Sequence, residues 1–391
     1  MVKPFQFTSL PVIYFGNGKI TDLPGIIKVY GKKIVLVTGK NSFLQSRQAG
    51  TLFQKLEETG IKYHQVIISG EPSTGIIDQN VARLSGEEID TVVGIGGGSV
   101  LDAGKAVSAM IYKTGSVKDY LEGVGNKEHP GTKIPFIAVP TTSGTGSEAT
   151  KNAVISNIGK DGFKRSLRHN NFVPDIAIVD PGPTVTCPPG ITAASGMDCF
   201  TQLTEAYLSD KSGEYTDALA LEGLKAIKSS LLGAFNDGND IEARTGMSFA
   251  ALTSGICLTN AGLGVIHGFA SSIGGIYDIP HGVICGTLMA ISNEVTVRRL
   301  RELRGNQEAL KKYILLGKLF LGNLKKSDSY FIDGFIEYLH HMTEELKLPG
   351  LSKAGIMEND LKKISLITEC KNNPVKLETD NLMEILSRRF K

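Results

Sequence analysis

The stretch DTVVGIGGGSVLDAGKA at residues 90–106 indicates a buried strand, a glycine turn and then a helix. Its Val/Ile run, without polar alternation, is typical of a strand buried on both faces of a parallel sheet. Gly96, Gly97 and Gly98 would let backbone N–H groups approach a diphosphate, and the following helix N-terminus adds partial positive charge. Ser99 stands where the strict dinucleotide fingerprint has its last glycine. The glycines could therefore serve a tight turn only.

Similar apolar runs lie on both sides of this stretch. We predict strands at 12–15, 34–39, 92–98, 136–140 and 176–180, with crossover helices between them. From about residue 190 the β-rich runs stop and helical patterns continue to the end. We therefore expect an α/β Rossmann-like domain with a parallel sheet over residues 1–185 and an all-α helical domain over 186–391. The Gly/Pro-rich segment DPGPTVTCPPG at 180–190 marks the boundary.

A second loop, VPTTSGTGSEAT at 139–150, follows another predicted strand and is rich in hydroxyl groups. Thr141, Thr142 and Thr145 could donate to phosphate or ribose oxygens. The plainer alternative is an ordinary helix start capped by Thr145 or Ser147. Open α/β sheets bind ligands at the carboxyl ends of their strands, and two such loops there favour a bound nucleotide.

The segments GMDCFTQLTEAY at 196–207 and GLGVIHGFASSIGGIYDIPHG at 262–282 carry four possible metal ligands. Asp198 and Gln202 are four residues apart, so both project from one face of a helix. His267 and His281 lie among glycines and alanines that allow close backbone approach. A divalent metal needs three or four nitrogen or oxygen donors from different elements. The alternative is that the histidines are ordinary core residues and Asp198 is a helix cap.

Composition excludes several classes of protein. Net charge is +2 and 21% of the 391 residues are charged, so no nucleic-acid or acidic-membrane partner is expected. No run approaches the roughly 18–20 apolar residues of a membrane helix, and the N-terminus lacks the apolar core of a signal peptide. Five scattered cysteines, never in C-x-x-C, predict reduced buried thiols in a cytoplasmic protein: Cys187, Cys199, Cys257, Cys285 and Cys370.

Together these motifs resemble the iron-containing (group III) alcohol dehydrogenases, relatives of glycerol dehydrogenase and dehydroquinate synthase. The resemblance runs from FGNGKI at 15–20 to NNPVKL at 372–377 and includes PDIAIVDP at 174–181. It implies a dehydroquinate synthase-like fold, with NAD(P) and one divalent metal, Fe or Zn, held in a cleft between the two domains. It also implies a small-molecule substrate and a homo-oligomer, a dimer or larger.

The resemblance assigns roles residue by residue and exposes two departures. The metal ligands would be Asp198, His267 and His281, but Gln202 stands where the family has a histidine, so the metal is expected to be weakly held or absent. A further histidine near the substrate is replaced by Ser271, which could relay a proton only through water. The implied cofactor contacts are Gly96, Gly97, Gly98, Ser99, Asp102, Thr141, Thr142, Thr145 and Lys164.

The segment after the second predicted strand bears on the choice of cofactor. Family members that prefer NAD often place an Asp there to accept from the ribose 2′-hydroxyl. Here Gly39, Lys40, Asn41 and Ser42 offer a cation and donors, which suit a 2′-phosphate. We therefore predict NADP rather than NAD, unless Lys40 is only a solvated surface lysine.

The predicted function is metal-assisted hydride transfer between NADP and a small primary alcohol or its aldehyde. Two alternatives remain open. One is a metal-independent reductase of the same fold that acts on a polar or acidic carbonyl compound. The other is a nucleotide-binding protein whose catalysis has decayed.

Overall fold

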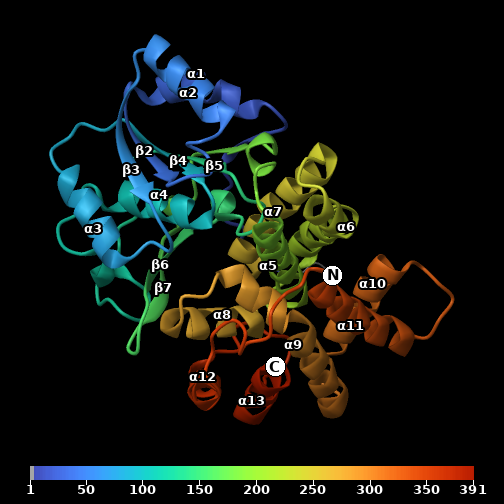
Figure 1. Cartoon of the computed structure of the whole chain (residues 1–391). Coiled ribbons are helices and arrows are strands. Elements are labelled where there is room, and N and C mark those ends of the chain that lie inside the picture. The colour runs from blue at the N-terminus through green and yellow to red at the C-terminus, as the bar shows by residue number, and fades with distance from the viewer. Residues whose placement is uncertain (1–3) are drawn as a thin grey trace.

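The first half of the chain is an α/β unit, which a computed structural model describes together with the rest of residues 4–391 (Figure 1). Its main sheet has six parallel strands in the order β1-β8-β5-β4-β2-β3. The strands are β1 (Val12–Phe15), β2 (Lys33–Gly39), β3 (Lys62–Ile68), β4 (Thr91–Gly96), β5 (Phe136–Pro140) and β8 (Ile176–Val179). The helices are α1 (Leu23–Tyr30), α2 (Arg47–Glu58), α3 (Thr74–Arg83) and α4 (Gly98–Met110).

Strand β2 shows why the apolar runs predict this sheet. Val35 and Val37 pack into one hydrophobic cluster, whereas Ile34 and Leu36 pack into another on the opposite face. Both faces are therefore covered, as a parallel sheet requires. The expected parallel α/β domain is confirmed.

Three strands were not predicted from the sequence. Strand β3 lies at an edge of the sheet, where polar residues such as Lys62 and Gln65 are tolerated, so it lacks a continuous apolar run. Strands β6 (Asn152–Asn157) and β7 (Phe163–Arg168) form a separate antiparallel hairpin. This hairpin extends from the α/β half toward the helical half (Figure 1).

The second half is helical, as expected, and no strand follows β8 in the described chain. Sheet gives way to helix between Val179 and Pro189, the interval that contains the predicted boundary. The helices are α5 (Pro189–Leu208), α6 (Glu214–Asn236), α7 (Ile241–Ala261), α8 (Val265–Ile276), α9 (His281–Leu303), α10 (Gln307–Leu321), α11 (Asp328–Glu345), α12 (Leu361–Ile367) and α13 (Thr379–Arg388). Helix α5 is almost entirely buried at the centre of this half.

Helix length and apolarity bear on membrane insertion. Within residues 4–391, no single helix is long and apolar enough to cross a membrane. One bent pair, α7 with α8, meets the criterion only when the two helices are taken together.

Candidate functional site

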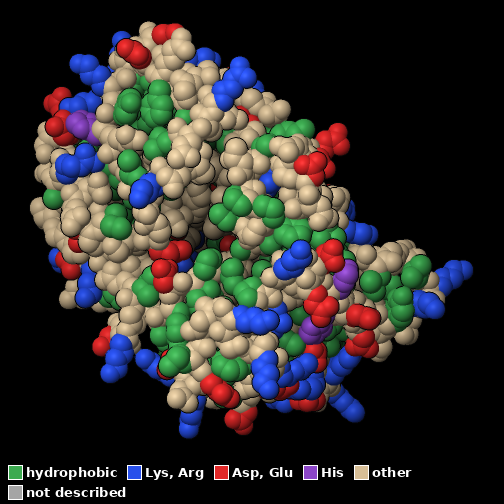
Figure 2. All heavy atoms as spheres, in the orientation of Figure 1, with side chains coloured by type: hydrophobic (Ala, Val, Ile, Leu, Met, Phe, Trp, Pro, Cys, Tyr) green, Lys and Arg blue, Asp and Glu red, His purple; other side chains and the backbone are tan. Residues whose placement is uncertain are grey.

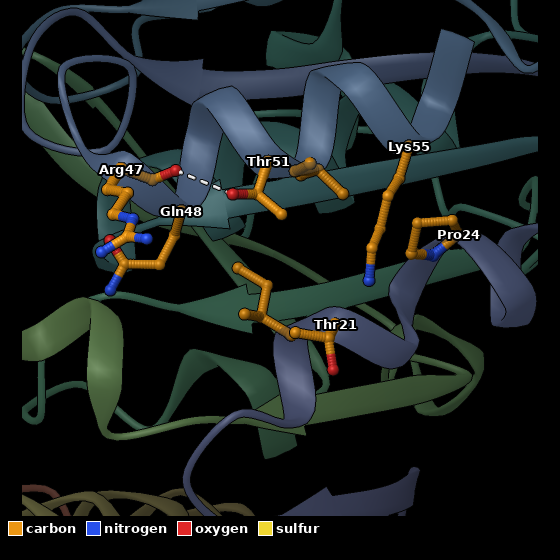
Figure 3. Close-up of a pocket in the computed structure, with 8 residues that line it drawn as sticks. Thr21, Pro24, Arg47, Gln48, Thr51 and Lys55 are labelled. Atoms are coloured by element: carbon orange, nitrogen blue, oxygen red, sulfur yellow. Dashed lines mark hydrogen bonds between the residues drawn. The ribbon is translucent and has the colours of Figure 1, made fainter. Parts of the chain in front are cut away.

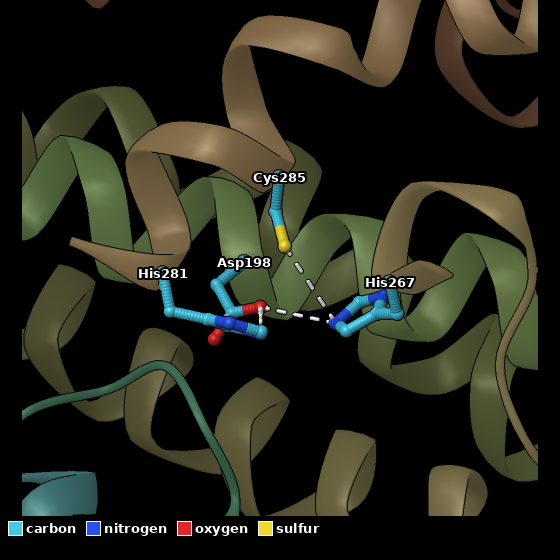
Figure 4. Close-up of side chains that lie close together, drawn as sticks. All are labelled: Asp198, His267, His281 and Cys285. Atoms are coloured by element: carbon cyan, nitrogen blue, oxygen red, sulfur yellow. Dashed lines mark hydrogen bonds and ion pairs between the residues drawn. The ribbon is translucent and has the colours of Figure 1, made fainter. Parts of the chain in front are cut away.

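Three helices bring Asp198, His267 and His281 to one point (Figure 4). Asp198 is on α5, His267 on α8, and His281 is the first residue of α9. Asp198 Oδ1 is 3.3 Å from Nε2 of His267 and 3.7 Å from Nε2 of His281. The structure therefore places together three of the four predicted metal ligands, which come from distant parts of the chain.

Glycines make this convergence possible. Gly262 ends α7 at φ 73°, a left-handed conformation that favours glycine, and α8 leaves at 98° to α7. At the start of α9, a Cβ on Gly282 would lie 2.1 Å from the carbonyl oxygen of Ala194. Only glycine fits so close to α5, and this contact sets His281 beside Asp198.

Glu205 orients His267 and was not recognised from the sequence. Its Oε2 lies 2.6 Å from Nδ1 of His267, and its Oε1 accepts from the backbone N–H of Ile266 at 2.7 Å. An Nδ1–H that donates to a carboxylate leaves Nε2 free to face Asp198, the usual arrangement around metal-bound histidines. The available signal was spacing, because Glu205 follows Asp198 by seven residues, two turns along the same helix face.

Gln202, the fourth predicted ligand, has a different partner. Its Oε1 accepts from Ser254 Oγ on α7 at 2.7 Å. Cys285 instead lies beside the three ligands, with Sγ 3.7 Å from His267 Nε2. Donor atoms of Asp198, His267, His281 and Cys285 all lie within 4.8 Å of one another. Cys285 was expected to be only a buried thiol, although it stands one helical turn after His281.

The electrostatics suit a cation. Burial by itself raises the pKa of Asp198, but His281 and His267 outweigh that effect and hold the pKa below its usual value. Burial lowers the pKa of His281 to about 3, and Asp198 offsets only part of that effect. The cluster thus offers a carboxylate and, at His281, a neutral imidazole. At His267, burial is outweighed by Cys285, Asp198 and Glu205, which hold the pKa well above its usual value, so a divalent metal would displace a proton from that ring. The donor set and its spacing fit such a metal.

The two phosphate-loop candidates lie side by side at the carboxyl ends of β4 and β5. The backbone N–H of Thr141 donates to the Gly96 carbonyl at 3.0 Å. A Cβ on Gly98 would lie 2.6 Å from Cγ2 of Thr145, and one on Gly97 would lie 3.2 Å from Oγ1 of Thr142. Any larger residue would push the loops apart, so the glycines bring the threonine hydroxyls to the start of α4, where Ser99 also lies.

Asp102 links these loops within the protein. Its Oδ1 accepts from Ser147 Oγ at 2.6 Å, and its Oδ2 accepts from the backbone N–H of Val154 at 3.0 Å. Lys105 Nζ lies 3.7 Å from the same carboxylate. Both carboxylate oxygens have protein partners, so the geometry supports a positioning role for this predicted cofactor contact.

The segment Gly39–Ser42 directly follows β2, which pairs with β4. It therefore ends at the same edge of the sheet as the glycine turn. Lys40, Asn41 and Ser42 are exposed there. These four residues can be reached by a ligand that extends from the glycine turn toward β2.

Lys164 lies on β7, where the hairpin contacts α8. Its Nζ forms an ion pair with Glu71 Oε2 at 2.9 Å. A pocket between the hairpin and α8 is lined by Lys164, Ser271 and Lys371, among others, and Figure 2 shows the surface hollowed between the two halves. Ser271 Oγ donates to the His267 carbonyl at 2.8 Å and accepts from Lys371 Nζ at 3.3 Å. Ser271 is therefore one turn from His267 and bound to a cation.

A second pocket lies within the α/β half, between α1 and α2 (Figure 3). Arg47, Thr51 and Lys55 of α2 face Thr21 and Pro24 across it. None of the predicted site residues lines this pocket. Lys164 and Ser271 line the other pocket instead, and Ser271 bonds to the carbonyl of His267.

Comparison with known proteins matches both halves of the chain to one family. Residues 11–181 match the family model for iron-containing alcohol dehydrogenase, and residues 192–390 match the C-terminal model of the same family. An NAD-dependent methanol dehydrogenase from Bacillus methanolicus is 34% identical over 71% of this chain and 72% of its own length. An NADPH-dependent butanol dehydrogenase from Clostridium saccharobutylicum is 28% identical over 97% of this chain and 96% of its own.

The fold agrees as well. The crystal structure of an archaeal halo-thermophilic alcohol dehydrogenase from a Red Sea brine pool superposes with a TM-score of 0.89. The two chains are 26% identical, and the match covers 99% of this chain and 100% of the other. With both halves matched in sequence and in fold, the chain belongs to the iron-containing alcohol dehydrogenase family and is an oxidoreductase of the alcohol dehydrogenase type.

Proposed function

We propose that this alcohol dehydrogenase is metal-assisted and NADP-dependent, and that it interconverts a small primary alcohol and its aldehyde. The observation that carries this proposal is the meeting of Asp198, His267 and His281, with Glu205 orienting one imidazole. The proposed metal ligands are Asp198, His267 and His281. When bound, the metal would act as a Lewis acid toward the substrate oxygen, and the nicotinamide would carry the hydride.

The residues of the chain bind the cofactor, orient the metal ligands and transfer protons. The glycine turn and threonine loop hold the diphosphate with backbone N–H and hydroxyl donors. Ser271, which replaces an imidazole, is bonded to His267 O and Lys371 Nζ. Its hydroxyl can pass a proton to water in the pocket, but it cannot act as a base near neutral pH. We therefore expect proton transfer to run through water in this enzyme.

The test of this function combines elemental analysis with NADPH oxidation against a panel of aldehydes. We expect one divalent metal per chain, turnover with small unsubstituted aldehydes, and loss of turnover after treatment with a chelator. Turnover that persists in demetallated protein would support the metal-independent reductase instead. Cofactor binding without turnover on any substrate would support decayed catalysis.

Lys40→Asp should reverse the cofactor preference. The wild type is expected to have a higher kcat/KM with NADPH than with NADH, because Lys40 is proposed to bond the 2′-phosphate. A charge-assisted hydrogen bond contributes about 1.5–3 kcal/mol, so the NADPH/NADH ratio should fall roughly 10- to 100-fold. Steady-state kinetics with both cofactors measures this ratio.

The matched control is Lys32→Asp. Lys32 is exposed and lies just before β2, at the opposite end of the strand from Lys40. The Lys32→Asp substitution should leave the NADPH/NADH ratio unchanged. An equal fall in both variants would show that the change in net charge, and not a bond from Lys40, lowers the ratio. A wild-type preference for NADH would contradict the proposed cofactor.

One observation favours the second candidate, a substrate with an acidic group. Lys371 donates to the His267 carbonyl at 2.9 Å and to Ser271, which leaves one of its three N–H donors without a partner among these contacts. Its backbone has φ 50°, a strained conformation for a non-glycine residue that is often found at functional sites. Lys164 faces the same pocket from the other half. Lys164 is already paired with Glu71, so Lys371 is the cation that would suit an anionic substituent.

Lys371→Met tests this second candidate. For an aldehyde that carries a carboxylate or phosphonate, KM should rise roughly 10- to 100-fold, because a charge-assisted bond of about 1.5–3 kcal/mol is lost. For a neutral aldehyde of the same length, KM should change little. The control Lys376→Met removes an exposed lysine five residues away. Equal KM values for both aldehydes in the wild type would contradict an acidic substrate.

A further inference from the structure

The proposed metal site has a fourth donor that comes from a different helix than the family pattern implies. Cys285 is fully buried on α9, one turn after His281. Figure 4 shows its sulfur directed toward Asp198 and His267. The Sγ to His267 Nε2 distance is 3.7 Å, and the four donor atoms lie within 4.8 Å of one another.

Three of the six separations among these donor atoms match tetrahedral coordination, and all six lie within 4.8 Å. Around zinc, bonds of about 2.0–2.1 Å to nitrogen or oxygen and about 2.3 Å to sulfur put neighbouring donors about 3.3–3.6 Å apart. The observed separations are 3.3 Å and 3.7 Å from Asp198 to the two imidazoles, and 3.7 Å from His267 to the sulfur. Three separations in a buried cluster thus agree with one ion held between these groups.

Gln202, where the family pattern has a histidine ligand, bonds to a residue outside the cluster. Gln202 bonds to Ser254 on α7, and a neutral amide is a weak donor toward transition metals. A cysteine thiolate is a stronger and softer donor than an amide. Together with Asp198 it brings two negative charges to the donor set, which favours a divalent cation in a buried site where unpaired charge is costly. The local chemistry therefore favours Cys285 over Gln202.

We propose that Cys285 is the fourth metal ligand of this enzyme and makes the site an Asp-His-His-Cys centre that favours zinc-like ions. The inference rests on the proposed metal-assisted function. Coordination displaces the thiol proton to solvent and forms the metal–sulfur bond, with no change in oxidation state. Gln202 then has a structural role in joining α5 to α7.

Cobalt titration of the full-length apoprotein reads the metal–sulfur bond directly. In the wild type, Co²⁺ should give a thiolate-to-cobalt charge-transfer band in the near ultraviolet. The band should be absent in Cys285→Ala and kept in Gln202→Ala. Zinc affinity of Cys285→Ala, measured by chelator competition, should fall at least about 100-fold, because losing even an outer-shell partner costs about 10- to 100-fold.

Two further variants keep the inference falsifiable. Cys199→Ala removes an equally buried thiol next to Asp198 that is not in the cluster, and it should keep both the band and the affinity. Adding Gln202→His to Cys285→Ala should restore zinc affinity without the charge-transfer band. Circular dichroism and thermal unfolding check that each variant is folded.

Failure of this inference differs from failure of the proposed function. If the wild type binds Co²⁺ and Zn²⁺ tightly without a charge-transfer band, and Cys285→Ala binds equally well, Cys285 is not a ligand and the metal-assisted function stands. If the wild type binds neither ion but reduces aldehydes, the metal-assisted function and this inference are both overturned.

Discussion

Asp198→Asn should lower kcat/KM for aldehyde reduction by about 10³-fold. Asp198 is the carboxylate among the proposed ligands and lies within 3.7 Å of both imidazoles. Asparagine keeps the shape but removes the charge, so the cation should be lost. Lewis-acid stabilisation contributes several kcal/mol, and about 4 kcal/mol corresponds to the expected factor at 1.36 kcal/mol per tenfold change.

The measurement pairs steady-state NADPH oxidation with metal content for each variant. Asp210→Asn is the matched control, because Asp210 is exposed just after α5 and lies outside the cluster. It should behave as the wild type. Near wild-type turnover in metal-free Asp198→Asn protein would show that carbonyl polarisation comes from elsewhere in the site.

Lys105→Met should destabilise the fold by about 3–5 kcal/mol. The buried Nζ donates to the carbonyl oxygens of Ser147, Thr150 and Asn152, and it is the cation beside Asp102. Burial lowers the pKa of Lys105 to about 8 and raises that of Asp102, so keeping both groups charged in the interior costs free energy. Removing one partner leaves the other buried without a countercharge.

Chemical denaturation of the variants measures this loss. Lys118→Met, at an exposed position, is the control and should change stability by less than about 0.5 kcal/mol. Combining Lys105→Met with Asp102→Asn should cost less than the sum of the single changes, because the orphaned charge is gone. Strictly additive losses would mean that the pair is not coupled. The threonine loop rests on these bonds, so NADPH affinity should also weaken in Lys105→Met.

The α/β half could be predicted from the sequence because its signals are local. Continuous Val/Ile runs predict buried parallel strands, and Gly96 to Gly98 follow one of them directly. Strands β3, β6 and β7 escaped prediction because edge and hairpin strands carry polar residues, and their pairing depends on distant partners. Lys164 could thus be named as a site residue without the hairpin that brings it to α8.

The candidate site could likewise be predicted only where its signals are local. Asp198, His267 and His281 could be recognised as potential ligands, and two loops as suited to phosphate, because residue type and short spacing are local properties. The contacts of Gln202 with Ser254, of Glu205 with His267 and of Cys285 with the ligands are visible only in the folded chain. They depend on the packing of α5, α7, α8 and α9, because close contacts at glycines such as Gly282 set which face of each helix meets the others.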